Sequence, residues 1–308
     1  MDALDSVQLN FSPVAVLVLN GLLAIIVFGI ALDLTVADFL RVRQRWRALA
    51  AGLLAQWLLL PVVTLALVVL LEPSASLALG MVLIAVCPGG TVSNFFSHLA
   101  RGDVALSVSL SAFSSLACFV LMPLGIAFWG GLLPLTRGLL ATIHIDFLQM
   151  LILVAAVLIT PTVLGMLLSH YRPQLASTLQ KPFRWFGLGS FALFVVLAFV
   201  ANGRLFMAHG SEIIGIVFIH NAVALLLGVG FATLMRCTAR ERRTIGIEVG
   251  IQNTALGLTV AFTFFPALGS MALITAWWGV WHLFSGAALS LYWSRRQPSA
   301  VSPSLARR

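Results

Sequence analysis

One acidic residue stands apart from the other charged residues of this sequence. Glu248 lies within the apolar stretch TIGIEVGIQNTALGLTVAF, and Gln252 follows it four residues later. A carboxylate in such a segment is costly to bury in a bilayer and therefore marks a functional site. In a continuous helix, Gln252 would lie on the same face as Glu248. Alternatively, Glu248 could lie near the cytoplasmic end of the stretch, where it would be solvated and would face Arg242 or Arg243.

A second polar cluster interrupts another apolar stretch, LALGMVLIAVCPGGTVSNFFSHLA. Pro88 and the two glycines after it cannot support a continuous helix, so we expect a break over Cys87–Asn94. Ser93 and Asn94 supply hydroxyl and amide oxygens at this break. The helical segment that restarts near Thr91 would present free N–H groups, which stabilise an anion.

Further oxygen atoms near these residues suit a hard cation such as sodium. The backbone carbonyls near Val249 and Ile251 belong to a second interruption, which we place at Glu248–Asn253. Three serines of the next apolar stretch fall at i, i+4 and i+7, on one helical face: Ser107, Ser111 and Ser114. Small serines also permit close helix packing, and we favour that simpler role for Ser114.

Four more polar side chains lie in the middle of apolar stretches: Gln56, His220, Asn221 and His282. A lone histidine in such a place is more often a hydrogen-bonded packing residue than an ion ligand or a proton relay. An intramembrane enzyme would need a serine–histidine pair at depth, and a sensory or scaffold protein is a third class to consider. The sequence contains no H-E-x-x-H motif, Gly-rich nucleotide loop or nucleophile elbow.

The composition places the chain in a membrane. Of its 308 residues, 60% are hydrophobic and 9% are charged, whereas a soluble domain carries roughly 25% charged residues. The formal net charge of +8 could suggest nucleic acid as a partner. The basic residues, however, occupy short loops between apolar runs, where membrane topology places them. We therefore expect a membrane-embedded protein that binds no nucleic acid.

Nine apolar runs are long enough to be spanning segments, each needing about 20 residues. They are 13–32, 46–71, 76–98, 104–130, 147–168, 185–202, 212–235, 244–265 and 269–292. We expect the segment Thr35–Arg45 to lie along the membrane surface as an amphipathic piece. The tail 297–308 is polar, and we expect it to be disordered in the cytoplasm.

The distribution of positive charge supports this count and sets the orientation. Sixteen of the 18 Lys and Arg residues fall in the segments that are cytoplasmic if the N-terminus is outside, and only Arg137 and Arg204 fall outside. The two interrupted spans are then five spans apart and oppositely oriented, which is a transporter pattern. The predicted fold is an all-α polytopic membrane protein. It would contain two inverted five-helix repeats, of which the first repeat lacks its first helix, and two interrupted helices that cross each other.

Two long motifs resemble the bile acid:sodium symporter family: CPGGTVSNFFSHLARGDVALSVSLSAFSSL and RRTIGIEVGIQNTALGLTVAF. The shorter motifs LLAQWLLLP, IHNAVALLLG and VWHLFSGAALSLYW fit the same pattern. The resemblance runs from about residue 13 to residue 296 and suggests a bacterial member in the inner membrane.

The resemblance implies a single transporter unit, 1–296, made of two domains. The panel domain would hold spans 13–32, 147–168 and 185–202. The core domain would hold spans 46–71, 76–98, 104–130, 212–235, 244–265 and 269–292. One sodium site would use Ser93, Asn94, Ser107, Ser111 and Glu248. The other would use Gln56, Glu248, Gln252 and the carbonyls of Val249 and Ile251. Substrate would contact Thr91, Asn253 and His282.

The function that the resemblance implies is sodium-coupled import of an organic anion by alternating access, with Na+ as the coupling ion and no cofactor. The substrate would be bile-acid-like or a small carboxylate such as pantoate, and no obligate protein partner is expected. Proton-coupled or uncoupled transport is the alternative.

Ser111 stands where some bacterial members have Thr, which keeps the hydroxyl. Leu283 stands where some members have Asn, so the substrate contact beside His282 departs from the family pattern.

Overall fold

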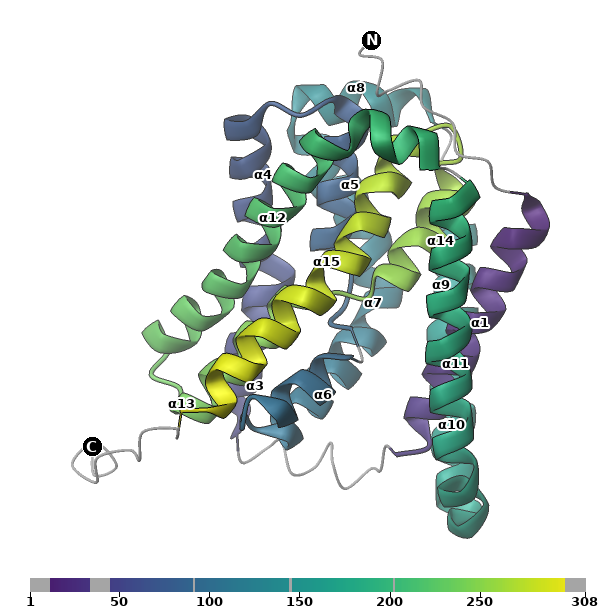
Figure 1. Ribbon diagram of the computed structural model, residues 1–308, viewed down its shortest axis with the longest axis vertical. Helices are drawn as coiled ribbons and strands as arrows, with labels where there is room; N and C mark the ends of the chain where they lie inside the picture. The colour runs from purple at the N-terminus through teal and green to yellow at the C-terminus, as the bar shows by residue number, and fades with distance from the viewer. Residues whose placement is uncertain (1–11, 34–44, 91, 144–145, 202, 297–308) are drawn as a thin grey trace.

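The computed structural model describes residues 12–33, 45–90, 92–143, 146–201 and 203–296. Within these ranges the regular structure is helical, apart from one isolated antiparallel bridge between Gly89 and Gln252. Most of the helices run roughly along the long axis of the molecule (Figure 1). The expected surface piece before Arg45 and the expected tail 297–308 lie outside the described residues.

The elements follow in this order: α1 (Pro13–Ala31), α3 (Trp46–Leu54), η2 (Ala55–Leu59), α4 (Leu60–Leu71), α5 (Ala75–Ala85), α6 (Val92–Leu99), α7 (Val104–Leu132), α8 (Pro134–Thr142), α9 (Phe147–Val154), η3 (Ala155–Ile159), α10 (Thr160–Tyr171), α11 (Pro173–Ala201), α12 (Gly203–Leu234), α13 (Ala239–Gly250), α14 (Thr254–Phe264) and α15 (Gly269–Ser294). The elements η2 and η3 are single π-helical turns that join α3 to α4 and α9 to α10.

Six helical stretches of the described chain are long and apolar enough to cross a membrane: Val14–Ala31, Trp46–Leu71, Val104–Leu132, Phe147–Tyr171, Glu212–Leu234 and Gly269–Ser294. Two of the other predicted spans are divided into short helices, α5 with α6 and α13 with α14. The count of nine spans and the inverted repeat stay predictions.

The ends of the helices follow local capping chemistry. Asp103 caps α7 by accepting a hydrogen bond from the backbone N–H of Leu106, and Asn253 caps α14 in the same way. Thr238 and Glu241 form a reciprocal capping box at the start of α13. Such side chains satisfy N–H groups that have no partner within the helix.

Two helix boundaries differ from the predicted ranges, and one helix was not predicted. The helix over the predicted span 185–202 begins at Pro173, because a proline suits a first turn and the polar residues after it do not prevent a helix. The helix over 212–235 begins at Gly203. The short helix α8, which starts at Pro134, was not predicted because its nine residues are too few for a spanning pattern.

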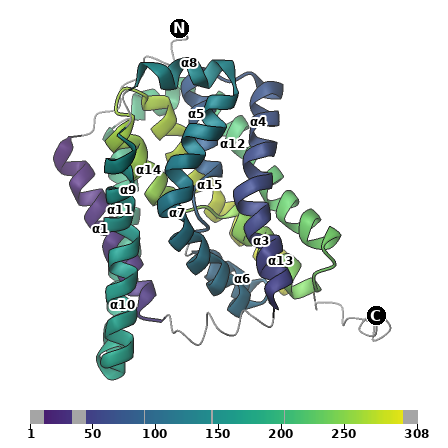
Figure 2. The same cartoon turned by 180° about the vertical axis from the view of Figure 1, so that it is seen from behind.

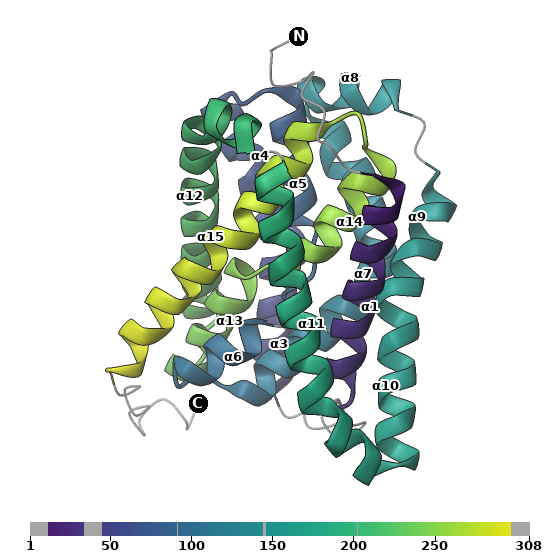
Figure 3. The same ribbon diagram turned by 45° about the vertical axis from the view of Figure 1, so that its right-hand side comes forward.

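The contacts between helices show which elements lie side by side. Helix α1 contacts α10, α11 and η3, and these elements lie along one side of the molecule, as Figures 2 and 3 show from two directions. Elsewhere, α12 packs on α13 and α15, while α5 packs on α15 and α7. All residues of α5 from Ser76 to Ala85 are buried, so this short helix is covered on every side.

Candidate ion site at the crossing of two broken helices

The two breaks lie against each other and exchange backbone hydrogen bonds. The N–H of Gly90 donates to the carbonyl of Ile251 at 2.6 Å, and the N–H of Asn253 donates to the carbonyl of Pro88 at 2.9 Å. Together they form the bridge between Gly89 and Gln252. Unpaired backbone groups are costly in a bilayer, and each break satisfies polar groups of the other.

The first break is shorter than the predicted Cys87–Asn94. Helix α5 ends at Ala85 and α6 begins at Val92, so Ser93 and Asn94 lie in the first turn of α6. The second break also differs from the predicted Glu248–Asn253, because α13 continues to Gly250. The carboxylate of Glu248 therefore projects from the last helical turn of α13.

The Glu248 carboxylate accepts hydrogen bonds from three serine hydroxyls of two other helices. Ser93 on α6 donates to Oε2 at 2.6 Å, and Ser107 on α7 donates to the same oxygen at 3.2 Å. Ser111, one turn further along α7, donates to Oε1 at 2.6 Å. The hydroxyl of Ser111 also lies 3.4 Å from the amide oxygen of Asn94. The structure thus brings together all five residues of the first predicted sodium set.

This cluster is buried and carries a negative charge when Glu248 is ionised. Glu248 is 2% exposed, and Ser93 and Ser107 are fully buried. In the described part of the chain, no Lys or Arg side chain forms an ion pair with Glu248. A buried carboxylate without a cation is strongly disfavoured, so the site requires either a bound cation or a proton.

Gly89 brings the backbone of the first break close to this carboxylate. A Cβ added at Gly89 would lie 2.8 Å from Cδ and 3.1 Å from Cγ of Glu248, and would collide with Oε1. A side chain at this position would therefore displace Glu248, and glycine is required for the close approach.

A pair of glutamine side chains lies beside the crossing. Gln56, in the π-helical turn η2, donates from Nε2 to the carbonyl of Cys87 at 2.7 Å and to Oε1 of Gln252 at 2.9 Å. Gln252 in turn donates to the carbonyl of Val249 at 2.6 Å. The carbonyl of Ile251 accepts from Gly90, as described above. These contacts join three of the five residues of the second predicted set, namely Gln56, Gln252 and Val249.

The position of Gln252 corrects one step of the sequence reasoning. Helix α13 ends at Gly250 and the next residue is extended, so Gln252 does not share a helical face with Glu248. Among the described residues, Glu248 and Gln252 form no direct hydrogen bond with each other; Gln252 instead reaches Gln56, 196 residues away in the sequence.

The predicted substrate residues are not joined by any hydrogen bond of the described chain. The side-chain oxygen of Asn253 caps α14 by accepting from the N–H of Leu256. His282 is buried on α15, and its carbonyl accepts a hydrogen bond from Ser285. Thr91 lies outside the described residues. Their role in substrate contact stays a prediction.

The side chains of Asn221 and His220 form hydrogen bonds that the sequence did not indicate. Asn221 donates from Nδ2 to the carbonyl of Gly250 at 2.8 Å, and its Oδ1 accepts from Ser285 at 2.6 Å. His220 lies 2.8 Å from the hydroxyl of Thr64 and packs against Trp278. From the sequence, Asn221 and His220 were only polar residues in the middle of apolar stretches. Their hydrogen-bond partners Ser285 and Thr64 were not predicted. Gln56 and Asn221 each lie in the middle of an apolar stretch, and each donates from its side-chain amide to a backbone carbonyl of a broken helix. This shared position was the signal in the sequence that could have indicated a structural role for Asn221.

Two broken helices that cross at a buried polar site within a multi-pass helical membrane protein are typical of membrane transport proteins. A family model described as the sodium bile acid symporter family matches residues 21–209. The chain belongs to this family.

Several relatives show how widely this family is distributed. The "Uncharacterized sodium-dependent transporter YocS" of Bacillus subtilis (strain 168) is 34% identical over 89% of this chain and 82% of its own length. The "Probable sodium/metabolite cotransporter BASS2, chloroplastic" of Oryza sativa subsp. japonica is 28% identical over 89% of this chain, which spans 63% of that protein. The "Ileal sodium/bile acid cotransporter" of Homo sapiens is 28% identical over 79% of this chain and 68% of its own length.

Proposed function

We propose that the protein is a symporter that imports an organic anion together with sodium by alternating access. The observation that carries this proposal is the Glu248 cluster, a buried carboxylate with three hydroxyls and no cationic side chain bound to it in the described chain. Sodium supplies the missing positive charge and prefers oxygen ligands of this kind.

The serine hydroxyls can serve the carboxylate and a cation together. Each hydroxyl has one hydrogen, which it donates to Glu248, and two lone pairs that remain free to accept. Ser93, Ser107 and Ser111 therefore present oxygen atoms on the inner side of the cluster, and Asn94 adds an amide oxygen. Sodium at this first site would be bound by these four residues and Glu248.

The second proposed site lies beside the glutamine pair. Its oxygen atoms come from Gln56, Gln252 and the carbonyls of Val249 and Ile251, with Glu248 completing the set. The Gln252 amide nitrogen donates to the Val249 carbonyl, so a cation at that carbonyl requires the amide group to turn its oxygen inward. Binding of the second ion is thus coupled to a side-chain rearrangement.

The proposed substrate is an organic anion, bile-acid-like or a small carboxylate such as pantoate. Helices α6 and α14 both begin at the crossing, and the N-terminal ends of helices stabilise negative charge. Asn253, His282 and Thr91 are the proposed contacts. Two sodium ions with one monovalent anion carry one net positive charge, so the membrane potential adds about 2.3 kcal/mol per 100 mV to uptake.

The proposed motion is a rocking of one helix group against the other. The panel domain would contain α1, α9 with α10, and α11; the remaining spans would form the core domain that carries both ion sites. The similarity to a bacterial relative favours a bacterial inner membrane, and the charge distribution favours an orientation with the N-terminus outside and the C-terminus in the cytoplasm. No catalytic role and no resident cofactor is part of this proposal.

The test is sodium-dependent stabilisation and uptake by the purified protein. In choline-balanced buffers, sodium should raise the unfolding midpoint, and a sodium gradient should drive uptake of labelled pantoate or a bile acid into liposomes. Glu248→Gln should abolish the sodium effect, because the amide carries no charge. Glu241→Gln is the matched control, since it makes the same change near the start of the same helix.

Two results would count against this function. Sodium stabilisation that survives in Glu248→Gln would refute the proposed ion site. Uptake that is unaffected when choline replaces sodium, but that follows a proton gradient or only the substrate gradient, would favour the proton-coupled or uncoupled alternative.

A further inference from the structure

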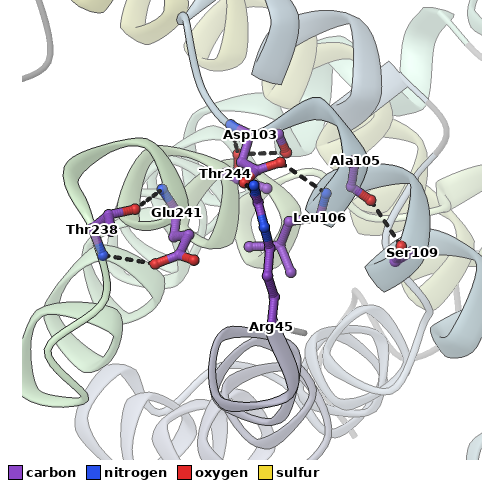
Figure 4. Close-up of polar contacts among 8 residues, drawn as sticks. All are labelled: Arg45, Asp103, Ala105, Leu106, Ser109, Thr238, Glu241 and Thr244. Carbon is purple, nitrogen blue, oxygen red and sulfur yellow. Dashed lines mark hydrogen bonds and ion pairs between the residues drawn. The ribbon is translucent and has the colours of Figure 1, made fainter. Parts of the chain in front are cut away.

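A compact polar junction lies in the middle of α13, one turn before Glu248. The backbone N–H of Asp103 donates to the hydroxyl of Thr244 at 2.8 Å, and that hydroxyl donates to the backbone carbonyl of Asp103 at 3.1 Å (Figure 4). A single threonine hydroxyl thus satisfies both backbone groups of the residue that precedes α7. The contact joins the start of α7 directly to α13.

The side chain of Asp103 connects a third helix. One carboxylate oxygen caps α7 by accepting from the N–H of Leu106 at 3.2 Å. The other forms an ion pair with Arg45, which directly precedes α3 (Figure 4). Asp103 is mostly buried, whereas half of the Arg45 side chain is exposed.

The spacing of these residues matches that of the ion site. Ser107 lies four residues after Asp103 on α7, and Glu248 lies four residues after Thr244 on α13. Four residues are one helical turn, so the junction lies one turn before the Ser107–Glu248 hydrogen bond on both helices. It fixes the register of α7 against α13 and therefore the distance between the serine hydroxyls and the carboxylate.

Gly102 permits the close approach of the two chains at this junction. A Cβ at Gly102 would lie 2.6 Å from the hydroxyl of Thr244 and 3.0 Å from the carbonyl of Ser97. Any larger residue would push α13 away from the start of α7. The junction is thus formed by backbone as well as by side chains.

We propose that Asp103 and Thr244 are positioning residues that set the sodium affinity of the Glu248 site without touching the ion. This inference rests on the proposed function. Asp103 links the helices that carry the proposed ligands: α7 with its serines, α13 with Glu248, and α3 followed by Gln56. Ligand groups must be held within about 0.5 Å of their working geometry. All three helices belong to the proposed core domain, so the junction persists while the domains rock.

The test compares sodium titrations of full-length purified variants, with the unfolding midpoint as the readout and choline keeping ionic strength constant. Thr244→Val keeps the side-chain shape and removes the hydroxyl. It should raise the half-saturating sodium concentration by about threefold or more, because two hydrogen bonds that fix the register are lost. Thr244→Ser retains the hydroxyl and should restore the wild-type value to within about twofold.

Thr238→Val is the matched control, because it removes a capping hydroxyl at the start of the same helix without touching α7. It should lower the unfolding midpoint in choline but leave the half-saturating sodium concentration unchanged.

Should Thr244→Val fail to fold, Asp103→Asn replaces it, since it keeps the capping oxygen and removes the charge paired with Arg45. This variant should raise the half-saturating concentration by about twofold or more.

The proposal is overturned if the folded Thr244 or Asp103 variant keeps the wild-type sodium titration, or if Thr238→Val shifts it equally. A failure of the proposed function has a different signature. In that case the wild-type protein shows no sodium stabilisation, or Glu248→Gln retains it. If the wild-type protein responds to sodium and Glu248→Gln does not, the proposed ion site is supported. The titrations of the Thr244 and Asp103 variants then test the positioning role alone.

Discussion

Substitution of Gly89 by alanine would press directly on the proposed ion site. The added Cβ would lie 2.8 Å from Cδ of Glu248 and closer still to Oε1, whereas ordinary contacts begin at 3.4 Å, so the carboxylate must retreat by at least about 0.6 Å. Hydrogen bonds from Ser93 and Ser111, both 2.6 Å long, would then lengthen beyond 3 Å or break. Overpacking of this kind costs about 1–3 kcal/mol. Since 1.4 kcal/mol corresponds to a tenfold change in affinity, a cost of this size borne by the ion site should raise the half-saturating sodium concentration by about fivefold to about a hundredfold.

The assay is a sodium titration of the unfolding midpoint, followed by sodium-driven uptake in liposomes. Gly131→Ala is the control, because a Cβ there meets no atom within 4 Å and α7 continues unchanged. That variant should keep the wild-type sodium response and gain up to about 1 kcal/mol of stability from its higher helix propensity. A folded Gly89→Ala protein with a wild-type sodium titration would contradict this prediction, because Glu248 would then not be held against the first break.

Four further substitutions, one of them a control, test contacts at the proposed ion site and elsewhere on the helices that carry it. Ser111→Ala removes a short hydrogen bond to Glu248 and should weaken sodium binding by about tenfold; Ser114→Ala should change little in the same titration, since the Ser114 hydroxyl has no hydrogen-bond partner in the described chain. Arg243→Lys should lower stability by about 1–3 kcal/mol in denaturant unfolding, because the guanidinium donates to three backbone carbonyls that a lysine cannot reach together. Asn221→Leu should cost about as much in the same assay, as it removes the side-chain donor to the Gly250 carbonyl and the shorter of the two acceptors of Ser285; an unchanged unfolding free energy in either variant would contradict the assigned contacts.

The contacts of Glu248 at the proposed ion site were partly predictable, because the chemistry there is concentrated in unusual residues. Glu248 is conspicuous in an apolar stretch, and Pro88 with two glycines marks the first break without any structure. The repeat of the serines by one turn on α7 then indicated a common face toward the carboxylate. The structure confirms that Ser107 and Ser111 reach Glu248, although sodium binding itself stays a proposal.

The exact limits of the breaks were not predictable. Residues such as Ser93 and Val249 are compatible with either a helix or an extended segment, and the choice depends on hydrogen bonds from the other break. The contact between Gln56 and Gln252 spans 196 residues, and no local pattern specifies it. The junction of Asp103 with Thr244 was missed for the same reason, because both look like ordinary residues near helix starts.

The shortness of α5 has a consequence for how the protein is made. Its 11 residues rise only about 16 Å, roughly half the thickness of the bilayer core, and every residue from Ser76 to Ala85 is buried by protein. During synthesis, α5 and the polar residues after it enter the membrane long before Glu248, which lies 155 residues beyond Ser93. The nascent chain must therefore hold an unsatisfied polar turn in the lipid until its last quarter is inserted. A chain truncated before Glu248 would lack both the Ile251 carbonyl that pairs with the Gly90 N–H and the carboxylate that accepts from Ser93.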